Sequence, residues 1–106
     1  MKELEITQEQ LQSTVVLHVV GAVDSNTAPE LQEALLRAIA TESSSGAVEL
    51  DLAKVSYLSS AGLRALLLAS KALQKRGERL TLLNVPPQIL NVLNLTGFTT
   101  FIDVKL

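Results

Sequence analysis

Two adjacent serines, Ser59 and Ser60, are the residues whose type and position best suit chemistry in this chain. They stand between an aliphatic strand pattern that ends at Leu58 and a segment with apolar residues at helical spacing. A hydroxyl group at the start of a helix lies beside backbone N–H groups that lack partners, where an anionic substituent is stabilised. Such a serine would therefore tolerate a phosphate group. The structural alternative is a helix cap, which serine usually provides at this position.

Catalysis by these serines is not expected, because the residues that would activate them are missing. The stretch Leu58–Gly62 lacks the first glycine of the G-x-S-x-G nucleophile elbow. His18, the single histidine, lies elsewhere in the chain with no identifiable acid partner, and no cysteine or second histidine accompanies it as a metal ligand. No G-x-x-x-x-G-K-S/T loop is present. We expect a protein that is not an enzyme and binds no cofactor or metal.

Length and charge limit the other classes of function. A chain of about 100–200 residues usually forms one core, so the 106 residues predict a single domain spanning 1–106. The formal net charge of −2 gives no electrostatic reason to expect nucleic-acid binding, which depends on a basic surface. The lack of cysteine suits a reducing compartment.

Neither a signal peptide nor a membrane span is predicted. Met1–Glu5 alternates in charge and lacks the apolar centre of a signal peptide. The most apolar stretch, Leu63–Leu73, contains Arg64 and Lys71 and is far shorter than the roughly 20 residues that a span needs. We therefore expect a cytoplasmic protein with no membrane insertion.

Strand patterns recur along the chain and should position the serine pair. They are expected at Leu4–Ile6, Thr14–Val20, Val48–Leu52, Leu80–Val85 and Phe101–Val104. The first two should form a hairpin, and the later strands should be parallel because each follows a helical stretch. In the third strand Glu49 and Asp51 alternate with aliphatic residues, which places both carboxylates on a face open to water.

Three helices are expected between these strands. Thr27–Glu30 has the form of a capping box with Thr27 as N-cap, and a loop at 42–46 follows the first helix. The second helix should run from about Ser60 to Arg76 and stop at Gly77. Pro86-Pro87 should open a short third helix that ends at Gly97. The predicted fold is α/β, with a mixed sheet of four to five strands and helices mainly on one face.

The stretch Asp51–Arg64 resembles the central motif of STAS domains in bacterial anti-sigma-factor antagonists. In that motif an aliphatic strand is followed by a serine pair and then by Gly-Leu. Other turns of the chain are also similar to turns of this family: Gly21–Asp24 before Thr27-Ala28, Gly77, Asn84–Pro87 and Leu95–Phe98. The resemblance covers almost the whole chain and implies a single STAS domain.

The resemblance also implies a regulatory cycle that is centred on Ser60. In the family, the serine two positions before the glycine is phosphorylated by a serine kinase that is itself the anti-sigma factor. The unphosphorylated antagonist binds this kinase and releases a sigma factor, and a serine phosphatase reverses the phosphorylation. The implied partner-binding residues are Asp24, Ser25, Asn26, Ser59, Ser60, Ala61, Gly62 and Arg64, in a monomer or weak dimer.

Local alternatives exist for several of these residues. Asp24 could serve only to turn the chain before Thr27, or could lie beside Ser60 and orient its hydroxyl. Gly62 could weaken the helix without further effect, or could permit a close approach of the backbone to its neighbours. Arg64 could be a solvated helix charge, or could contact a carboxylate of a partner.

Two residues of the motif depart from the family pattern, and the departure at Ser59 favours a different function. Ser59 stands where many switched members have Asp, and Ala61 stands where Ser or Thr is frequent. The alternative function is a STAS subunit that is not phosphorylated and acts as a scaffold in a transporter or a multi-protein signalling assembly. Many members also continue into a C-terminal helix that covers the sheet, so we expect the last strand here to be more exposed than usual.

Overall fold

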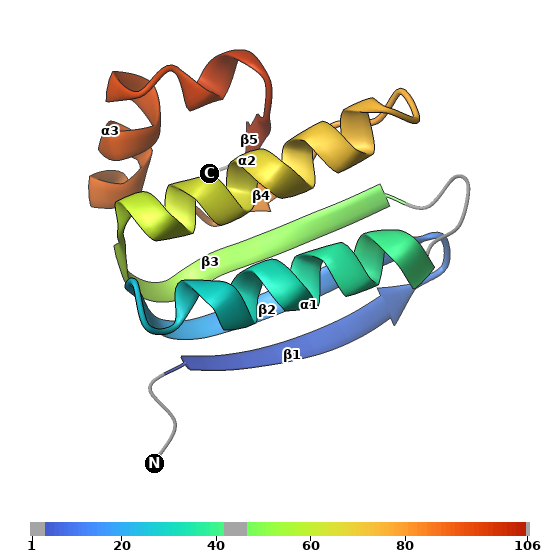
Figure 1. Ribbon diagram of the computed structural model, residues 1–106, viewed down its shortest axis with the longest axis horizontal. Helices are drawn as coiled ribbons and strands as arrows, with labels where there is room; N and C mark the ends of the chain where they lie inside the picture. The colour runs from blue at the N-terminus through green and yellow to red at the C-terminus, as the bar shows by residue number, and fades with distance from the viewer. Residues whose placement is uncertain (1–3, 42–46, 106) are drawn as a thin grey trace.

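The computed structural model describes residues 4–41 and 47–105, which form five strands in one sheet. The strands are β1 (Leu4–Leu11), β2 (Thr14–Val23), β3 (Ala47–Leu58), β4 (Thr81–Leu83) and β5 (Asp103–Lys105). Their order in the sheet is β1-β2-β3-β4-β5. β1 and β2 pair as an antiparallel hairpin, and all later neighbours are parallel (Figure 1). The predicted mixed α/β sheet is confirmed.

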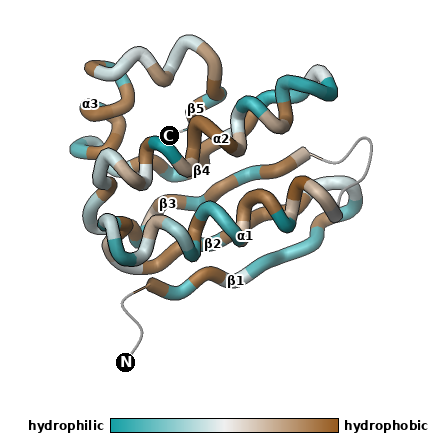
Figure 2. Tube along the Cα trace, in the orientation of Figure 1, coloured by the Kyte–Doolittle hydropathy of each residue, from teal (hydrophilic) through white to brown (hydrophobic). Residues whose placement is uncertain are grey.

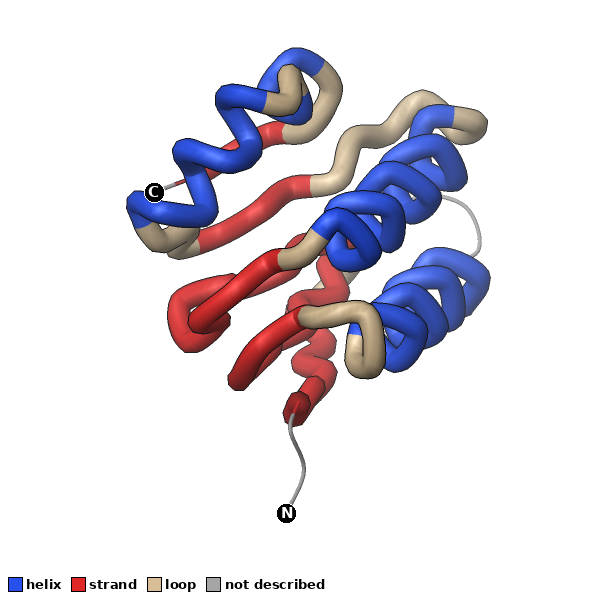
Figure 3. Tube along the Cα trace, turned by 60° about the vertical axis from the view of Figure 1, so that its left-hand side comes forward, coloured by secondary structure: helices blue, strands red, loops and turns tan. Residues whose placement is uncertain are grey.

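The helices are α1 (Ala28–Thr41), α2 (Ser60–Gln74) and α3 (Pro87–Leu95), with a short 3-10 helix η1 (Phe98–Thr100) after them. α1 and α2 lie side by side over one face of the sheet (Figures 1 and 3). Hydrophobic and hydrophilic residues alternate along both helices (Figure 2). This pattern is expected for a helix that packs one side against a sheet and exposes the other to solvent. The apolar sides of the helices and of the strands enclose one core.

The core follows from the period-two alternation of the two longest strands. Val15, Leu17 and Val19 of β2 are buried beneath the helices, and so are Val48, Leu50 and Leu52 of β3. Leu31 and Leu35 of α1, Leu66 and Leu73 of α2 and Leu93 of α3 complete the core. This core holds β2 and β3 parallel, so their carboxyl ends meet at the same edge of the sheet.

The predicted ends of α2 and α3 are close to those observed. Gly77 has a φ of 76°, and the amide of Glu78 donates to the Leu73 carbonyl (3.0 Å), which closes α2 two residues before the predicted end at Arg76. α3 begins with a proline in its first turn, and Gly97 with a φ of 78° follows it. Glycine suits both positions because it adopts positive φ without a steric cost.

Two local expectations, the capping box at Thr27 and the start of the last strand, were wrong, and a third lies outside the described residues. The hydroxyl of Thr27 accepts from the Asp24 amide (2.9 Å) and donates to the Ala22 carbonyl (2.8 Å), so it bonds backward and not in a capping box. The last strand begins at Asp103 and not at Phe101, because η1 and the Ile102 amide bond to Phe98 precede it. The loop predicted at 42–46 lies outside the described residues.

The sheet face that carries Glu49 and Asp51 is turned away from α1 and α2, and we call it the open face. Both carboxylate residues are half-buried on it. β3 departs from regular pairing with β2 at two places: the four residues Asp51–Lys54 face three residues of β2, and the three residues Val55–Tyr57 face two. Such bulges add a residue without a ladder partner and bend the strand.

Candidate functional site

The loop after β2 and the turn after β3 are joined by a backbone hydrogen bond. The Ser59 amide donates to the Val23 carbonyl at 2.8 Å, directly beyond the last paired residues of the two strands, Val23 and Leu58. Since Asp24 follows Val23 in the chain, the Asp24 loop and the serine pair form one surface at the carboxyl edge of the sheet. The expected proximity of the two loops is confirmed.

Ser59 is the N-cap of α2. Its backbone is extended (φ −82°, ψ 175°), and its hydroxyl oxygen accepts a hydrogen bond from the Gly62 amide at 3.2 Å. The Leu63 amide bonds to the Ser59 carbonyl at 2.9 Å. The structural interpretation of Ser59 is therefore confirmed, and it leaves the hydroxyl of Ser60 unused by the cap.

Ser60 is exposed in the first turn of α2. Among the described residues, none of the hydrogen bonds involves its hydroxyl group. Arg64, four residues later, is also exposed, whereas Ala61 is half-buried and packs against the core. Ser60 is thus reachable from solvent while its neighbours hold the helix in place.

Gly62 allows α2 to start directly against the ends of β2 and β3. A Cβ atom at this position would lie 2.6 Å from Leu58 Cδ1 and 2.8 Å from Val23 Cγ1. Both neighbours are buried, with Val23 at 0% exposure. The close approach predicted for Gly62 is confirmed, and it fixes where the serine pair leaves the sheet.

Asp24 organises its own loop. Its Oδ1 atom accepts hydrogen bonds from the Asn26 amide (2.8 Å) and the Thr27 amide (3.0 Å), and the Thr27 hydroxyl oxygen, whose one proton has Ala22 O as its nearer acceptor, lies 3.2 Å from it. The bonds from the Thr27 and Asn26 amides lower the pKa of Asp24 below its ordinary value. Within the described ranges, no hydrogen bond joins this carboxylate to Ser60. Ser25 and Asn26 are exposed beside it.

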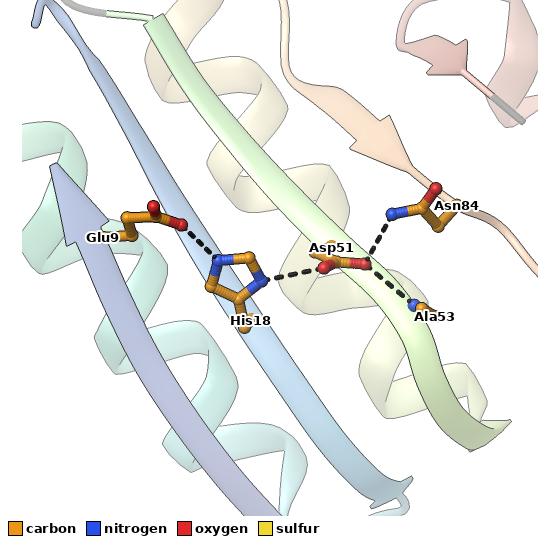
Figure 4. Close-up of polar contacts among 5 residues, drawn as sticks. All are labelled: Glu9, His18, Asp51, Ala53 and Asn84. Atoms are coloured by element: carbon orange, nitrogen blue, oxygen red, sulfur yellow. Dashed lines mark hydrogen bonds and ion pairs between the residues drawn. The ribbon is translucent and has the colours of Figure 1, made fainter. Parts of the chain in front are cut away.

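A second polar cluster lies on the open face and was not predicted from the sequence. His18 Nδ1 is 2.8 Å from Asp51 Oδ2, and His18 Nε2 is 2.8 Å from Glu9 Oε1, so the imidazole links β1, β2 and β3 (Figure 4). The hydrogen bond with Glu9 is the main cause that raises the pKa of His18, and the bond with Asp51 adds to it. A protonated imidazole donates to both carboxylates.

Asp51 is the centre of this cluster. Its Oδ1 atom accepts from the Ala53 amide (3.0 Å), a residue in the first bulge of β3, and from the Asn84 side-chain amide (3.1 Å; Figure 4). Partial burial works to raise the pKa of Asp51, but the three hydrogen-bonded partners outweigh it and lower the pKa. Both nitrogens of His18 and both oxygens of Asp51 are used, so the cluster is a structural link between strands.

Tyr57 belongs to the surface around the serine pair, and its position near them in the sequence is a signal for this. Tyr57, two residues before the serine pair, is 55% exposed because the second bulge of β3 interrupts the alternation there. An aromatic residue so close to the serines could have been added to the candidate surface. No sequence signal predicts the Glu9–His18 contact, since it depends on the register of the hairpin.

In the described part of the chain, no helix is long and apolar enough to cross a membrane. No group of three histidine, cysteine or carboxylate side chains in that part is placed to hold a metal ion.

Comparison with known proteins gives consistent results. The family described as "Mlab, STAS domain" matches residues 6–104. The putative anti-sigma factor antagonist BtrV of Bordetella bronchiseptica is 30% identical over 101 residues, covering 95% of this chain and 85% of that protein. The anti-sigma-B factor antagonist of Listeria monocytogenes is 30% identical over 89 residues, covering 84% of this chain and 76% of that protein.

Solved structures agree with the sequence relatives. An anti-sigma factor antagonist from Mycobacterium paratuberculosis superimposes with a TM-score of 0.84 at 26% identity, covering 96% of this chain and 85% of that one. The unphosphorylated form of the anti-sigma factor antagonist SpoIIAA has the same fold, with a TM-score of 0.77 at 20% identity over 94% of this chain and 87% of that one. With the family match over residues 6–104, these findings show that the chain belongs to the STAS domain family, among relatives named as anti-sigma factor antagonists.

Proposed function

We propose that this chain is an anti-sigma-factor antagonist, a binding protein and not an enzyme, whose affinity for its partner is controlled by phosphorylation of Ser60. The partner is an anti-sigma factor that is also a serine kinase, and its binding to the unphosphorylated chain releases a sigma factor. A serine phosphatase restores the unphosphorylated form. The domain spans 1–106 and acts as a monomer or weak dimer.

The observation that carries the proposal is the division of roles between the two serines. Ser59 caps α2 through the Gly62 amide, whereas Ser60 is exposed beside it. A kinase could therefore modify the Ser60 hydroxyl without removing the bond that starts the helix. The positive end of the helix dipole also favours a phosphate in the first turn.

The replacement of Asp by Ser at position 59 does not weaken this proposal. Ser and Asp are both strong N-cap residues, because each accepts a hydrogen bond from an amide in the first turn. Ser59 accepts that bond here. The difference between this chain and many switched members therefore keeps the start of α2 intact, which supports the proposal over the scaffold alternative.

The proposed contact surface combines the two loops and the first turn of α2. Its exposed or half-buried members are Asp24, Ser25, Asn26, Ser59, Ser60, Ala61 and Arg64, and the buried Gly62 fixes the turn beneath them. A phosphate on Ser60 adds about −1.5 to −2 charges at neutral pH at the middle of this surface. Binding would then require the anion to lose its water, so affinity falls while the fold is kept.

The test is phosphorylation by the anti-sigma-factor kinase encoded nearest to this gene. Intact-mass spectrometry after incubation with kinase and ATP should show one phosphate on the wild type and on Ser59→Ala, and none on Ser60→Ala. Calorimetry should show at least about tenfold weaker kinase binding after phosphorylation. The Ser60→Asp variant should remain folded and bind less tightly than wild type.

Two results would contradict the proposal. One is a kinase that binds the phosphorylated and unphosphorylated chains equally well. The other is a stable complex with membrane-transport components that Ser60 substitutions leave unchanged, which would favour the scaffold function.

A further inference from the structure

Arg64 lies one helical turn beyond Ser60 on the exposed side of α2. Both residues are exposed, and residues four apart on a helix are neighbours, with about 5–6 Å between their Cβ atoms. An anion that precedes a cation by four residues has the more favourable of the two orientations for a helical ion pair. A negatively charged group on Ser60 would therefore have a cation within reach.

The guanidinium of Arg64 is available for such a pair. The other three arginines form ion pairs: Arg37 with Glu33, Arg76 with Glu78 and Arg79 with Asp103. No ion pair of Arg64 is found among residues 4–41 and 47–105. The helix itself offers no competitor, since Ser60–Gln74 contains no Asp or Glu.

A fixed negative charge lies in the loop that adjoins the serine turn. Asp24 lies in the loop that is bonded to the serine turn through Val23 and Ser59, and its loop amides keep it ionised. A phosphate on Ser60 would add a second anion to the same surface. The repulsion between them falls if a cation neutralises part of the phosphate charge.

We propose that Arg64 binds the phosphate of phosphorylated Ser60 as its internal counter-ion. The planar guanidinium can donate two parallel N–H bonds to phosphate oxygens, a geometry that lysine cannot provide. In the unphosphorylated chain the same cation faces solvent and can reach a partner's carboxylate. Phosphorylation would thus add an anion to the contact surface and also withdraw its cation. This inference rests on the proposed phosphorylation of Ser60.

The experiment uses the full chain with phosphoserine incorporated at position 60 during translation, so that no kinase is needed. Phosphorus NMR gives the second pKa of the phosphate in wild type, Arg64→Gln and Arg64→Lys, with Lys71→Gln as the matched control on the same helix. Arg64→Gln should raise this pKa by about 0.3–0.6 units, and Arg64→Lys by less. Lys71→Gln should leave it unchanged, and 1 M salt should shrink the difference between wild type and Arg64→Gln.

An equal phosphate pKa in wild type and Arg64→Gln would overturn the inference, and so would an equal rise in Lys71→Gln. Because Arg64 is exposed, these variants should fold, and Arg64→Lys gives a second reading that keeps the charge. The proposed function has its own test and is contradicted if the kinase does not phosphorylate Ser60. A shifted phosphate pKa would still establish the pair in that case.

Discussion

Gly62 and Leu58 are in contact across the turn from β3 to α2, with no space between them for a methyl group. A Cβ atom on residue 62 would meet Leu58 Cδ1 at 2.6 Å and would also approach Val23 Cγ1. The start of α2 is therefore pressed against the end of the sheet. The position of Ser60 depends on this contact, because the serine lies two residues before the glycine.

Gly62→Ala should destabilise the fold by about 1 kcal/mol. Overpacking costs about 1–3 kcal/mol, and the better helix propensity of alanine recovers up to about 1 kcal/mol. Urea unfolding would give the change in the free energy of unfolding. The same substitution in a Leu58→Ala background should cost less, since the nearest clashing atom is gone. An equal cost in both backgrounds would show that the contact with Leu58 is not the cause.

Ser59→Ala should lower the free energy of unfolding by about 1 kcal/mol, because the Gly62 amide loses its side-chain acceptor. Ser60→Ala should change it by less than about 0.5 kcal/mol, as usual for an exposed side chain. Ser59→Asp should retain most of the stability, since aspartate caps as well as serine does. Chemical denaturation of the three variants tests whether Ser59, and not Ser60, caps α2. An equal loss of unfolding free energy in the two alanine variants would contradict this assignment.

Asp24→Ala should lower the melting temperature more than Asp24→Asn, because the asparagine Oδ1 can still accept from the amides of the loop. The folded-state pKa of Asp24 lies below its ordinary value of 3.8. Its charge therefore contributes stability above pH 3.8, and this contribution is lost as the pH falls through the folded pKa. Thermal unfolding from pH 2 to 7 should show wild type and Asp24→Asn converging in acid. A constant difference would contradict the role of the charge.

The placement of Asp24 near Ser59 and Ser60 could be predicted from the resemblance to the STAS family, and the backbone bond between Ser59 and Val23 at the ends of the parallel strands β2 and β3 accounts for it. The cluster around His18 could not. Alternation placed His18 on one face with Val16 and Val20, but its partner Asp51 is 33 residues away. Only the register of β2 against β3, interrupted by two bulges, decides which side chains meet. Single-strand patterns carry no information on that register.

The cluster predicts that stability falls as the pH rises above neutrality. The pKa of His18 is raised above 6.5 in the folded chain, so its charged form contributes fully below pH 6.5. That contribution is lost as the pH rises through the folded pKa. Urea midpoints between pH 5.5 and 9 should decline in wild type and vary less in His18→Gln. Proton NMR of the imidazole should show a lower pKa in Glu9→Gln than in wild type.

Glu5→Gln is the matched control for this measurement. Glu5 is exposed on the same strand, four residues from Glu9 and therefore on the same face. Thr7 lies opposite His18, so Glu5 and Glu9 are both diagonal to the imidazole, but among the described residues the side-chain contacts of His18 are with Glu9 and Asp51. Glu5→Gln should leave the pKa of His18 nearly unchanged. An equal fall of that pKa in both glutamine variants would mean that general charge, and not the 2.8 Å contact with Glu9, holds the proton.

Gln12 (55°) and Asn84 (53°) are non-glycine residues with a positive φ. Substitutions at these positions can separate the cost of backbone strain from the contribution of a side-chain hydrogen bond. Gln12→Gly should stabilise the chain by about 0.5–1 kcal/mol, because glycine adopts this conformation without strain in the β1–β2 turn. Asn84→Gly should gain less or lose stability, since the glycine cannot donate to Asp51 as the Asn84 side chain does (3.1 Å). Asn84→Ala should be the least stable of the three, because it adds strain of about 1–2 kcal/mol and loses the same bond. Urea unfolding would rank the variants, and an equal gain from glycine at both positions would show that the bond to Asp51 contributes nothing to the stability of the open face.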